Sequence, residues 1–310
     1  QVGDKPNDYD QVEAAINEYL APFNTKIATT FISWSDVGTM YSLVVAGGEQ
    51  VDLIFTAPWE YMYVEAAKGS FLTLEDEFLQ KYMPLSYKYQ PEESWGETTI
   101  QGKLVAVPSA DAAPQGKIVA VRKDLMDKYD IADLETWDDY MNYCLTIAEK
   151  ETPESGVYAL AAAGNTNELW DVYRQMTDTF LALDSNYMDF IYEYTDGIPA
   201  VEDIQFVYEY EPFREYAKDM KTLADAGCWS RSALTNTISD KDAFASLQGA
   251  SIAWNTSVFT YMKRAEENEG VECMAYDLTK DNLVTAEAYS NNDMAIAAGS
   301  KNPERSAMVL

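Results

Sequence analysis

One short segment, VDLIFT at residues 51–56, constrains the fold most because four of its six side chains are apolar, three of them consecutive. A strand with apolar residues on both faces must be covered on both faces, as in a parallel sheet between two helical layers. Pro58 fits the first turn of a following helix, and Gly69 fits the position just past its end. The segment therefore predicts a βα unit in an α/β protein.

The same alternation recurs along most of the chain. Apolar or β-branched runs predict strands at residues 26–34, 51–56, 103–107, 117–121, 157–162, 251–254 and 294–298. Apolar residues at helical spacing predict helices at residues 12–20, 37–44, 58–68, 137–148, 213–224 and 259–265. Strands that alternate with helices favour right-handed βαβ connections, so we expect mostly parallel sheets flanked by helices.

The length of 310 residues favours two domains. Residues 107–116 (VPSADAAPQG) are rich in Pro, Ala and Gly between two expected strands, and a polar stretch precedes the expected strand at 294–298. We expect an N-terminal lobe of residues 1–108 and 293–310, a C-terminal lobe of residues 117–284, and hinge crossings at 109–116 and 285–292. Because the first helix lacks a full preceding strand and a new helix begins at Asn302, we also expect both ends to be cut from a longer protein.

Charge excludes several classes of function. The chain has 52 Asp+Glu against 22 Lys+Arg, a formal net charge of −30, and no histidine. Such a chain repels nucleic acid and anionic membranes, and it has no Ser-His-Asp or Cys-His pair and no His-ligated zinc. Calcium loops and nucleotide-binding glycine motifs are absent from the sequence. We therefore predict no metal, no cofactor and no nucleic-acid partner.

The cysteines and the apolar runs do not identify the cellular compartment of the protein. Cys144 lies on the apolar face of an expected helix and is predicted to be a buried free thiol. Cys228 and Cys273 fit either a disulfide of an exported protein or two unpaired thiols. No run reaches the roughly 18 apolar residues of a membrane span.

Six motifs in a fixed order resemble a known family. They are GEQVDLIFTAPW (48–59), GSFLTLEDEFLQKYMP (69–84), GKLVAVP (102–108), VRKDLMDKYDI with TWDDY (121–131 and 136–140), KDAFASLQGASIAWN (241–255) and AIAAGSKNPERSAM (295–308). The series resembles the extracellular solute-binding proteins, family 1, of bacterial ABC importers, and is most similar to lipid-anchored Gram-positive members.

The resemblance implies a fold, a partner and a location. The expected fold is the type II periplasmic-binding-protein-like arrangement, two α/β domains joined by a hinge of crossing strands, with the ligand between the domains. The expected partner is the membrane permease of an ABC importer. The resemblance also implies a removed signal peptide and an acylated N-terminal cysteine, and we expect the protein to act as a monomer.

Candidate ligand residues follow from a rule about open α/β sheets. Ligands bind beyond the carboxyl ends of the strands, so polar and aromatic residues at these ends are candidates. The predicted ligand-binding residues are Asp4, Trp34, Thr56, Trp59, Glu60, Ser109, Asp111, Gln115, Asn165, Trp170, Trp254, Asn255 and Asn292.

The composition of this set favours a saccharide ligand. Indole faces cover the C–H face of a sugar ring, and amides and carboxylates form paired hydrogen bonds with its hydroxyls. Each residue also has a structural interpretation: Trp34 fits a core position, while Asp111, Asn165 and Asn292 fit turns or caps. Trp137 lies on a helical stripe and is assigned to the core.

Three functions remain open from the sequence. The leading one is a non-catalytic binding protein that captures a saccharide by hinge closure. A protein that binds a peptide or another small solute is the second. A glycoside-active enzyme with two carboxylates is the third, although no spacing singles out a carboxylate pair.

Overall fold

The chain forms two compact units, which are described separately. The computed structural model describes residues 1–34, 36–46, 51–109, 116–160, 168–176, 180–182, 190–193, 200–236, 238–278 and 288–310. Unit 1 comprises Gln1–Ala113 and Glu287–Leu310, and unit 2 comprises Pro114–Ala286. The two boundaries between the units, after Ala113 and after Ala286, fall within the segments expected to cross between the lobes. The lobe boundaries and the hinge role of these segments stay predictions.

Unit 1 is built around two small strand pairs. Its helices and strands are α1 (Tyr9–Leu20), α2 (Val37–Ala46), β1 (Leu53–Thr56), α3 (Met62–Lys68), α4 (Asp76–Tyr82), α5 (Pro84–Tyr89), α6 (Glu92–Glu97), β2 (Thr99–Ile100), β3 (Lys103–Leu104), β11 (Asp293–Ile296) and α14 (Pro303–Val309). Strand β1 pairs with β11 in antiparallel register, so that Thr56 faces Asp293. This pairing joins the two sequence segments of unit 1.

The apolar segment at 51–56 forms the buried centre of unit 1, as expected. Ile54 and Phe55 of β1 are buried among Tyr41 of α2 and Ala295 of β11. The Tyr41 hydroxyl donates a hydrogen bond to the Phe55 carbonyl oxygen at 2.7 Å. Gly69 ends helix α3 with φ of 76°, a left-handed conformation that favours glycine.

The prediction of a strand at residues 26–34 is wrong for most of the segment. Within this segment only Ile32 makes a strand bridge, to Val2. The backbone of the segment instead bonds to side chains of α1: the Asn17 amide bonds both the N–H and the carbonyl oxygen of Ile27, and Glu13 accepts from the Thr29 N–H. These side chains replace a neighbouring strand as hydrogen-bond partners.

The helix expected to begin near Pro58 begins four residues later, at Met62. Residues 57–61 form a tight turn in which the Glu60 N–H donates to the Ala57 carbonyl oxygen at 2.8 Å. Tyr61 then adopts a positive φ of 53° before the helix starts. Proline is as compatible with this turn as with a helical first turn, so the sequence pattern fits both.

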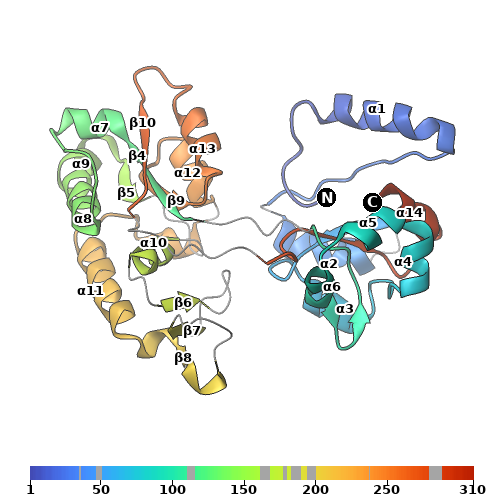
Figure 1. Ribbon diagram of the computed structural model, residues 1–310. Helices are drawn as coiled ribbons and strands as arrows, with labels where there is room; N and C mark the ends of the chain where they lie inside the picture. The colour runs from blue at the N-terminus through green and yellow to red at the C-terminus, as the bar shows by residue number, and fades with distance from the viewer. Residues whose placement is uncertain are drawn as a thin grey trace. The chain divides into compact units, whose positions relative to one another are not determined.

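Unit 2 contains a four-stranded sheet in the order β10-β4-β9-β5 and a three-stranded sheet in the order β6-β7-β8 (Figure 1). Its elements are β4 (Ile118–Arg122), α7 (Lys123–Lys128), α8 (Trp137–Thr146), α9 (Thr152–Ser155), β5 (Tyr158–Leu160), α10 (Leu169–Gln175), β6 (Phe180–Ala182), β7 (Phe190–Glu193), β8 (Ile204–Phe206), α11 (Glu211–Asp225), α12 (Asp240–Ala245), β9 (Gly249–Trp254), α13 (Val258–Ala265) and β10 (Cys273–Tyr276).

The expectation of mostly parallel sheets is wrong for the described strand ladders. In the four-stranded sheet, β5 and β9 are parallel, but β4 runs antiparallel to both β9 and β10. β4 is the first strand of unit 2 in the chain and β10 the last described one, and they pair with each other as neighbours. A strand that enters a lobe and a strand that leaves it can run in opposite directions. The periodicity of apolar residues in the sequence does not show the direction of a strand.

Helices cover both faces of this sheet (Figure 1). On one face, α8 packs with Trp137, Tyr140 and Tyr143 buried, and Trp137 is a core residue as expected. On the other face, α12 and α13 pack through Phe244 and Met262. Helix α8 begins at a capping box made by Thr136 and Asp139, which explains its sharp start.

The three cysteines are free. Cys144 is buried, as predicted, and the Cys228 thiol lies 3.5 Å from the Cys144 carbonyl oxygen. Cys273 belongs to β10, in a different packed cluster. Of the two alternatives left open for Cys228 and Cys273, the structure has the unpaired one.

No helix in the described part of the chain combines the length and the apolarity that crossing a bilayer requires.

Candidate functional site

The turn after β1 holds three of the predicted ligand residues, Thr56, Trp59 and Glu60. Thr56 is fully buried, and its hydroxyl donates to the Glu60 carbonyl oxygen at 3.1 Å. This bond and the Glu60-to-Ala57 backbone bond fold the segment back on itself. The turn fixes the position of the residue at its tip, Trp59.

Two indole rings meet beside this turn. The ring centroids of Trp34 and Trp59 are 6.0 Å apart at an interplanar angle of 37°. Trp34 remains 53% exposed. A Cβ atom added to Gly3 would lie 3.4 Å from the Trp34 indole nitrogen, so the glycine leaves room for the ring. The pair thus offers an accessible aromatic surface with a small residue beside it.

Trp59 is held in place by a segment far away in the sequence. Its indole N–H donates to the Asn291 carbonyl oxygen at 2.7 Å and lies 3.1 Å from the Asn291 side-chain oxygen. The Phe55 ring contacts Trp59 from β1, with centroids 5.6 Å apart. A ring with these contacts is preorganised to stack on a ligand.

Two buried carboxyl groups lie on the paired strands and the turn of this region. Glu60 is 4% exposed and Asp293 is fully buried, and burial raises the pKa of each to about 7. Asp293 accepts a hydrogen bond from the Ser290 hydroxyl at 2.7 Å, but its Oδ1 atom has no protein partner, and neither has Oε1 of Glu60. Such atoms are open to a hydroxyl donor or a water molecule.

In unit 2, Trp254 ends β9 at the edge of the sheet where β4 begins, and the parallel strand β5 ends earlier, opposite Ser251. The Lys241 ammonium lies 3.3 Å from the centroid of the Trp254 ring, and the Lys117 ammonium lies 5.0 Å from it. Lys117 also pairs with Glu168 at 3.0 Å. This edge therefore combines an indole with two cations.

Trp170 occupies the aromatic core of unit 2. It is 6% exposed and contacts Tyr173, Tyr210, Phe213 and Tyr216. Its indole nitrogen is buried without a hydrogen-bond partner. The ring face is covered by protein, so its expected ligand contact stays a prediction that this packing does not favour.

The other predicted residues are scattered. Asp4 and Asn292 are exposed, the Ser109 hydroxyl donates to the Tyr289 carbonyl oxygen at 3.1 Å, and the Asn255 side chain accepts from the N–H and hydroxyl of Ser257. Asp111, Gln115 and Asn165 lie outside the described residues. The structure brings together Trp34, Thr56, Trp59 and Glu60 in unit 1.

Sequence reasoning missed several residues of these two regions: Asp293, Lys117, Lys241 and Glu168. For Lys117 a signal existed, because basic residues are scarce in this chain and Lys117 is the first residue of an expected strand. For Asp293 the sequence shows only a polar residue before an apolar run.

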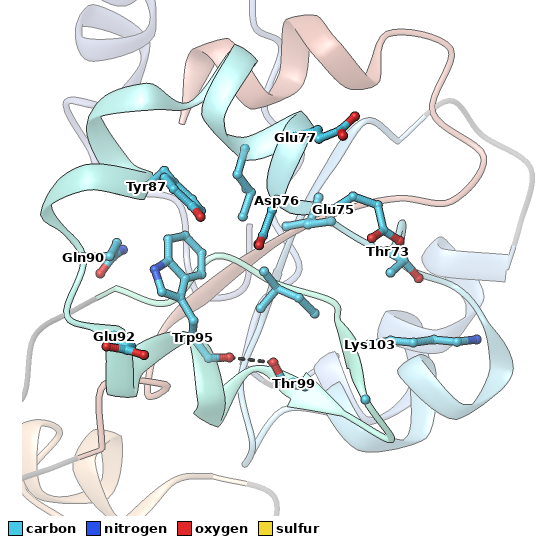
Figure 2. Close-up of a pocket in the computed structure, with 14 residues that line it drawn as sticks. Thr73, Glu75, Asp76, Glu77, Tyr87, Gln90, Glu92, Trp95, Thr99 and Lys103 are labelled. Atoms are coloured by element: carbon cyan, nitrogen blue, oxygen red, sulfur yellow. Dashed lines mark hydrogen bonds between the residues drawn. The ribbon is translucent and has the colours of Figure 1, made fainter.

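A separate hollow in unit 1 has a different lining (Figure 2). It has a volume of about 1020 Å³ and lies between α4, the segment around α5 and α6, and the β2–β3 hairpin. Its lining includes Tyr87, Trp95, Asp76 and Glu92, and Thr99 donates to the Trp95 carbonyl oxygen at 2.8 Å. None of the predicted ligand residues lines it, so we do not assign it to the ligand site.

Comparison with solved structures supports the fold. The chain matches the N-glycan transport solute binding protein of Streptococcus pneumoniae in complex with Man1GlcNAc with a TM-score of 0.70 at 18% identity, covering 100% of this chain and 65% of that one. It matches a substrate-binding protein of Listeria monocytogenes in complex with cycloalternan with a TM-score of 0.65 at 13% identity, covering 99% and 71%. The expected two-domain periplasmic-binding-protein-like fold is thus confirmed.

Sequence comparison identifies the family. A carbohydrate ABC transporter substrate-binding protein of Streptococcus pneumoniae is 24% identical over 237 residues, which are 73% of this chain and 43% of the relative. The chain thus spans less than half of that relative's length. The family profile of the bacterial extracellular solute-binding proteins matches residues 5–308. The chain belongs to the bacterial extracellular solute-binding protein family.

Proposed function

We propose that this chain is the substrate-binding component of an ABC importer and that its ligand is a saccharide or oligosaccharide. The observation that carries the proposal is the Trp34–Trp59 pair at the end of β1, with one indole half exposed and the other fixed by Asn291. Sugar rings stack on indole faces through their C–H groups. The names of the relatives, which include an N-glycan transport protein and a carbohydrate transporter component, agree with this ligand class.

Polar groups next to the indoles suit a hydroxyl-rich ligand. The unpartnered oxygens of Glu60 and Asp293 can each accept a hydrogen bond. A site of this kind discriminates strongly, because a ligand that lacks the matching hydroxyl leaves a buried polar atom unpaired. Stacking would supply affinity, and the carboxyl groups would select the sugar.

In the proposed mechanism the ligand binds first to one unit and is then enclosed by both. Residues 109–116 and 285–292 would act as the hinge. Contacts with both units would favour the closed state, and its population follows from the differential affinity of the ligand. Because Trp59 is bonded to Asn291, the stacking ring would move together with the end of the second crossing.

The proposal includes a location and a partner. The family is extracellular. We place the mature protein outside the cell, held at the membrane by an acyl anchor, where it acts as a monomer that docks on the permease. Metabolic labelling of the full-length protein with a clickable palmitate analogue tests the anchor, and the expected result is label at an N-terminal cysteine.

Binding without turnover fits the carboxyl groups better than glycoside hydrolysis does. A retaining or inverting glycosidase needs one protonated and one ionised carboxyl group. In unit 1, burial raises the pKa of both Glu60 and Asp293 to about 7, so their environments do not separate two roles.

A thermal-shift panel followed by product analysis tests the function. The chain is mixed with neutral and acidic oligosaccharides, free monosaccharides and short peptides, and its melting temperature is measured. We expect a rise with at least one saccharide and no new products after prolonged incubation. A rise with peptides alone, or products formed at enzymatic rates, would replace the proposal by one of the two competing functions.

A further inference from the structure

In unit 2, a lysine side chain covers one face of the Trp254 ring, so this face is not available for stacking. The Lys241 ammonium nitrogen lies 3.3 Å from the ring centroid, in cation–π contact. Lys241 belongs to α12, which packs against β9. A neutral sugar ring therefore has no access to the indole face beneath Lys241.

The charges around Lys241 are almost all engaged in pairs of their own. Glu168 pairs with Lys117, Asp171 with Arg174, and Asp242 with Arg264, each at 3.0 Å. The carboxylate of Asp240 accepts a hydrogen bond from the backbone N–H of Lys241, at 2.9 Å. Among the described residues, no carboxylate lies within ion-pair distance of the Lys241 ammonium.

This arrangement is unusual for so acidic a chain. With 52 acidic residues and 22 basic ones, a lysine has many carboxylates available to it. Lys241 is nevertheless partly buried without one, and its burial lowers its pKa, although Asp240, Glu168 and Asp242 act in the opposite direction. A partly desolvated cation without a counter-ion is costly, and an anion brought by a ligand would offset that cost.

The position of the lysine fits such a ligand. Trp254 is the last residue of β9, and it lies at the edge of the sheet toward which the parallel strand β5 also runs, β5 itself ending opposite Ser251. Ligands of open α/β sheets bind beyond this edge. Resting on the proposed function, we infer that the saccharide is acidic and that Lys241, oriented by the Trp254 ring, binds its carboxylate or sulfate group in unit 2.

Matched pairs of saccharides test the inference by titration calorimetry at low salt. The pairs are sialyllactose and lactose, trigalacturonic acid and its methyl ester, and 6-sulfolactose and lactose. The first two pairs report on a carboxylate and the third on a sulfate ester. We expect the acidic member of at least one pair to bind about tenfold or more tightly than its neutral partner, as a charged hydrogen bond allows. The preference should shrink as salt is added.

Three variants locate the effect. Lys241→Met keeps the length of the side chain and should abolish the preference, with a less than about twofold change for neutral saccharides. Lys241→Arg keeps the cation over the ring and should retain most of the preference. Lys263→Met removes an exposed charge from α13 and should change nothing. Circular dichroism establishes that each variant is folded.

The outcomes separate the inference from the function on which it rests. If neutral saccharides bind and no acidic partner binds more tightly, the inference is wrong and the proposed function stands. The inference is equally wrong if the preference survives in Lys241→Met. If no saccharide of either kind binds, both the proposed function and the inference are wrong.

Discussion

Each unit places a tryptophan at the carboxyl end of a buried strand, but the two units surround it differently. In unit 1, Trp59 contacts a second, half-exposed indole, and the nearby acids Glu60 and Asp293 each keep an unpartnered oxygen. In unit 2, Trp254 lies under a lysine, and the neighbouring acids have cationic partners. The same residue type therefore serves as a stacking surface in one unit and as a support for a cation in the other.

The difference has a consequence for stability as well as for binding. Buried charges that pair inside the protein are costly to separate, whereas buried carboxyl groups without cations favour the protonated form. We therefore expect unit 2 to lose most stability when a buried charge partner is removed, and unit 1 to lose most ligand affinity when an indole ring is removed.

The largest effect is expected from Arg174→Met in unit 2. Arg174 and Asp171 form an ion pair whose side chains are 3% and 2% exposed. Removal of the Arg174 cation leaves the buried Asp171 carboxylate without this ion pair, and the free energy of unfolding should fall by about 3–5 kcal/mol. Urea unfolding of the full chain measures the change.

The control for this prediction is Lys221→Met, which breaks a pair whose side chains are 72% and 69% exposed. Exposed pairs contribute less than about 1 kcal/mol. If both variants lose the same stability, the contrast between paired buried charges and surface charges does not hold for this protein.

The second effect concerns binding in unit 1. Trp59→Ala removes the fixed ring of the indole pair, and buried aromatic anchors contribute about 2 kcal/mol or more, so saccharide affinity should fall about 30-fold or more. Trp254→Leu should weaken a neutral saccharide much less, because that ring supports Lys241. Calorimetry with a neutral saccharide from the panel compares the two, and equal losses would contradict the comparison.

The third effect is a pH dependence of opposite sign at two carboxyl groups, Glu60 in unit 1 and Glu151 in unit 2. Burial raises the folded-state pKa of Glu60 to about 7, so the folded chain holds this proton more tightly than the unfolded chain does. Its contribution to stability is therefore present below the ordinary carboxyl pKa and is lost as the pH rises to about 7. Glu60→Gln should remove this loss, on the order of 1–3 kcal/mol.

Glu151 in unit 2 supplies the matched case. Burial would raise its pKa, but hydrogen bonds from Lys128, Ser155 and Tyr129 outweigh burial and hold it at about 2. Its contribution is present above the ordinary carboxyl pKa and is lost as the pH falls toward about 2. As the pH rises from 4 to 8, Glu60→Gln should therefore become more stable relative to wild type and Glu151→Gln less stable, as measured by unfolding free energies. Parallel curves would refute the assignment.

The smallest effect is expected from Asn291→Ala. This change removes the 3.1 Å contact of the Trp59 indole with the side chain but keeps the 2.7 Å bond to the backbone oxygen. Loss of one such bond should weaken saccharide binding about two- to fivefold. A loss as large as that of Trp59→Ala would mean that Asn291 itself contacts the ligand.

Much of the fold could be predicted from local patterns. The apolar run at 51–56 is the buried strand β1, Gly69 ends α3, and the stripe that contains Trp137 faces the core. Each of these features is encoded within about one turn or one strand, where side-chain spacing fixes the buried face. The ordered motifs along the chain indicated the family, which the profile match confirmed.

Strand direction and strand partners could not be predicted in the same way. The segment at 26–34 has a strand-like composition, yet Asn17 and Glu13 of α1 take its backbone hydrogen bonds. The antiparallel course of β4 depends on where the chain enters unit 2. Composition reports that a segment is extended and half-buried, and it does not report its neighbour.

The sequence by itself determined that this acidic, histidine-free chain is an α/β solute-binding protein with tryptophans at its strand ends. Only the tertiary structure decided what those tryptophans do. Asn291 fixes Trp59 across 232 positions in the chain, and Lys241 of α12 covers the ring of Trp254. The physical reason is that burial, hydrogen bonding and charge pairing depend on neighbours in space, and residues distant in the sequence supply them.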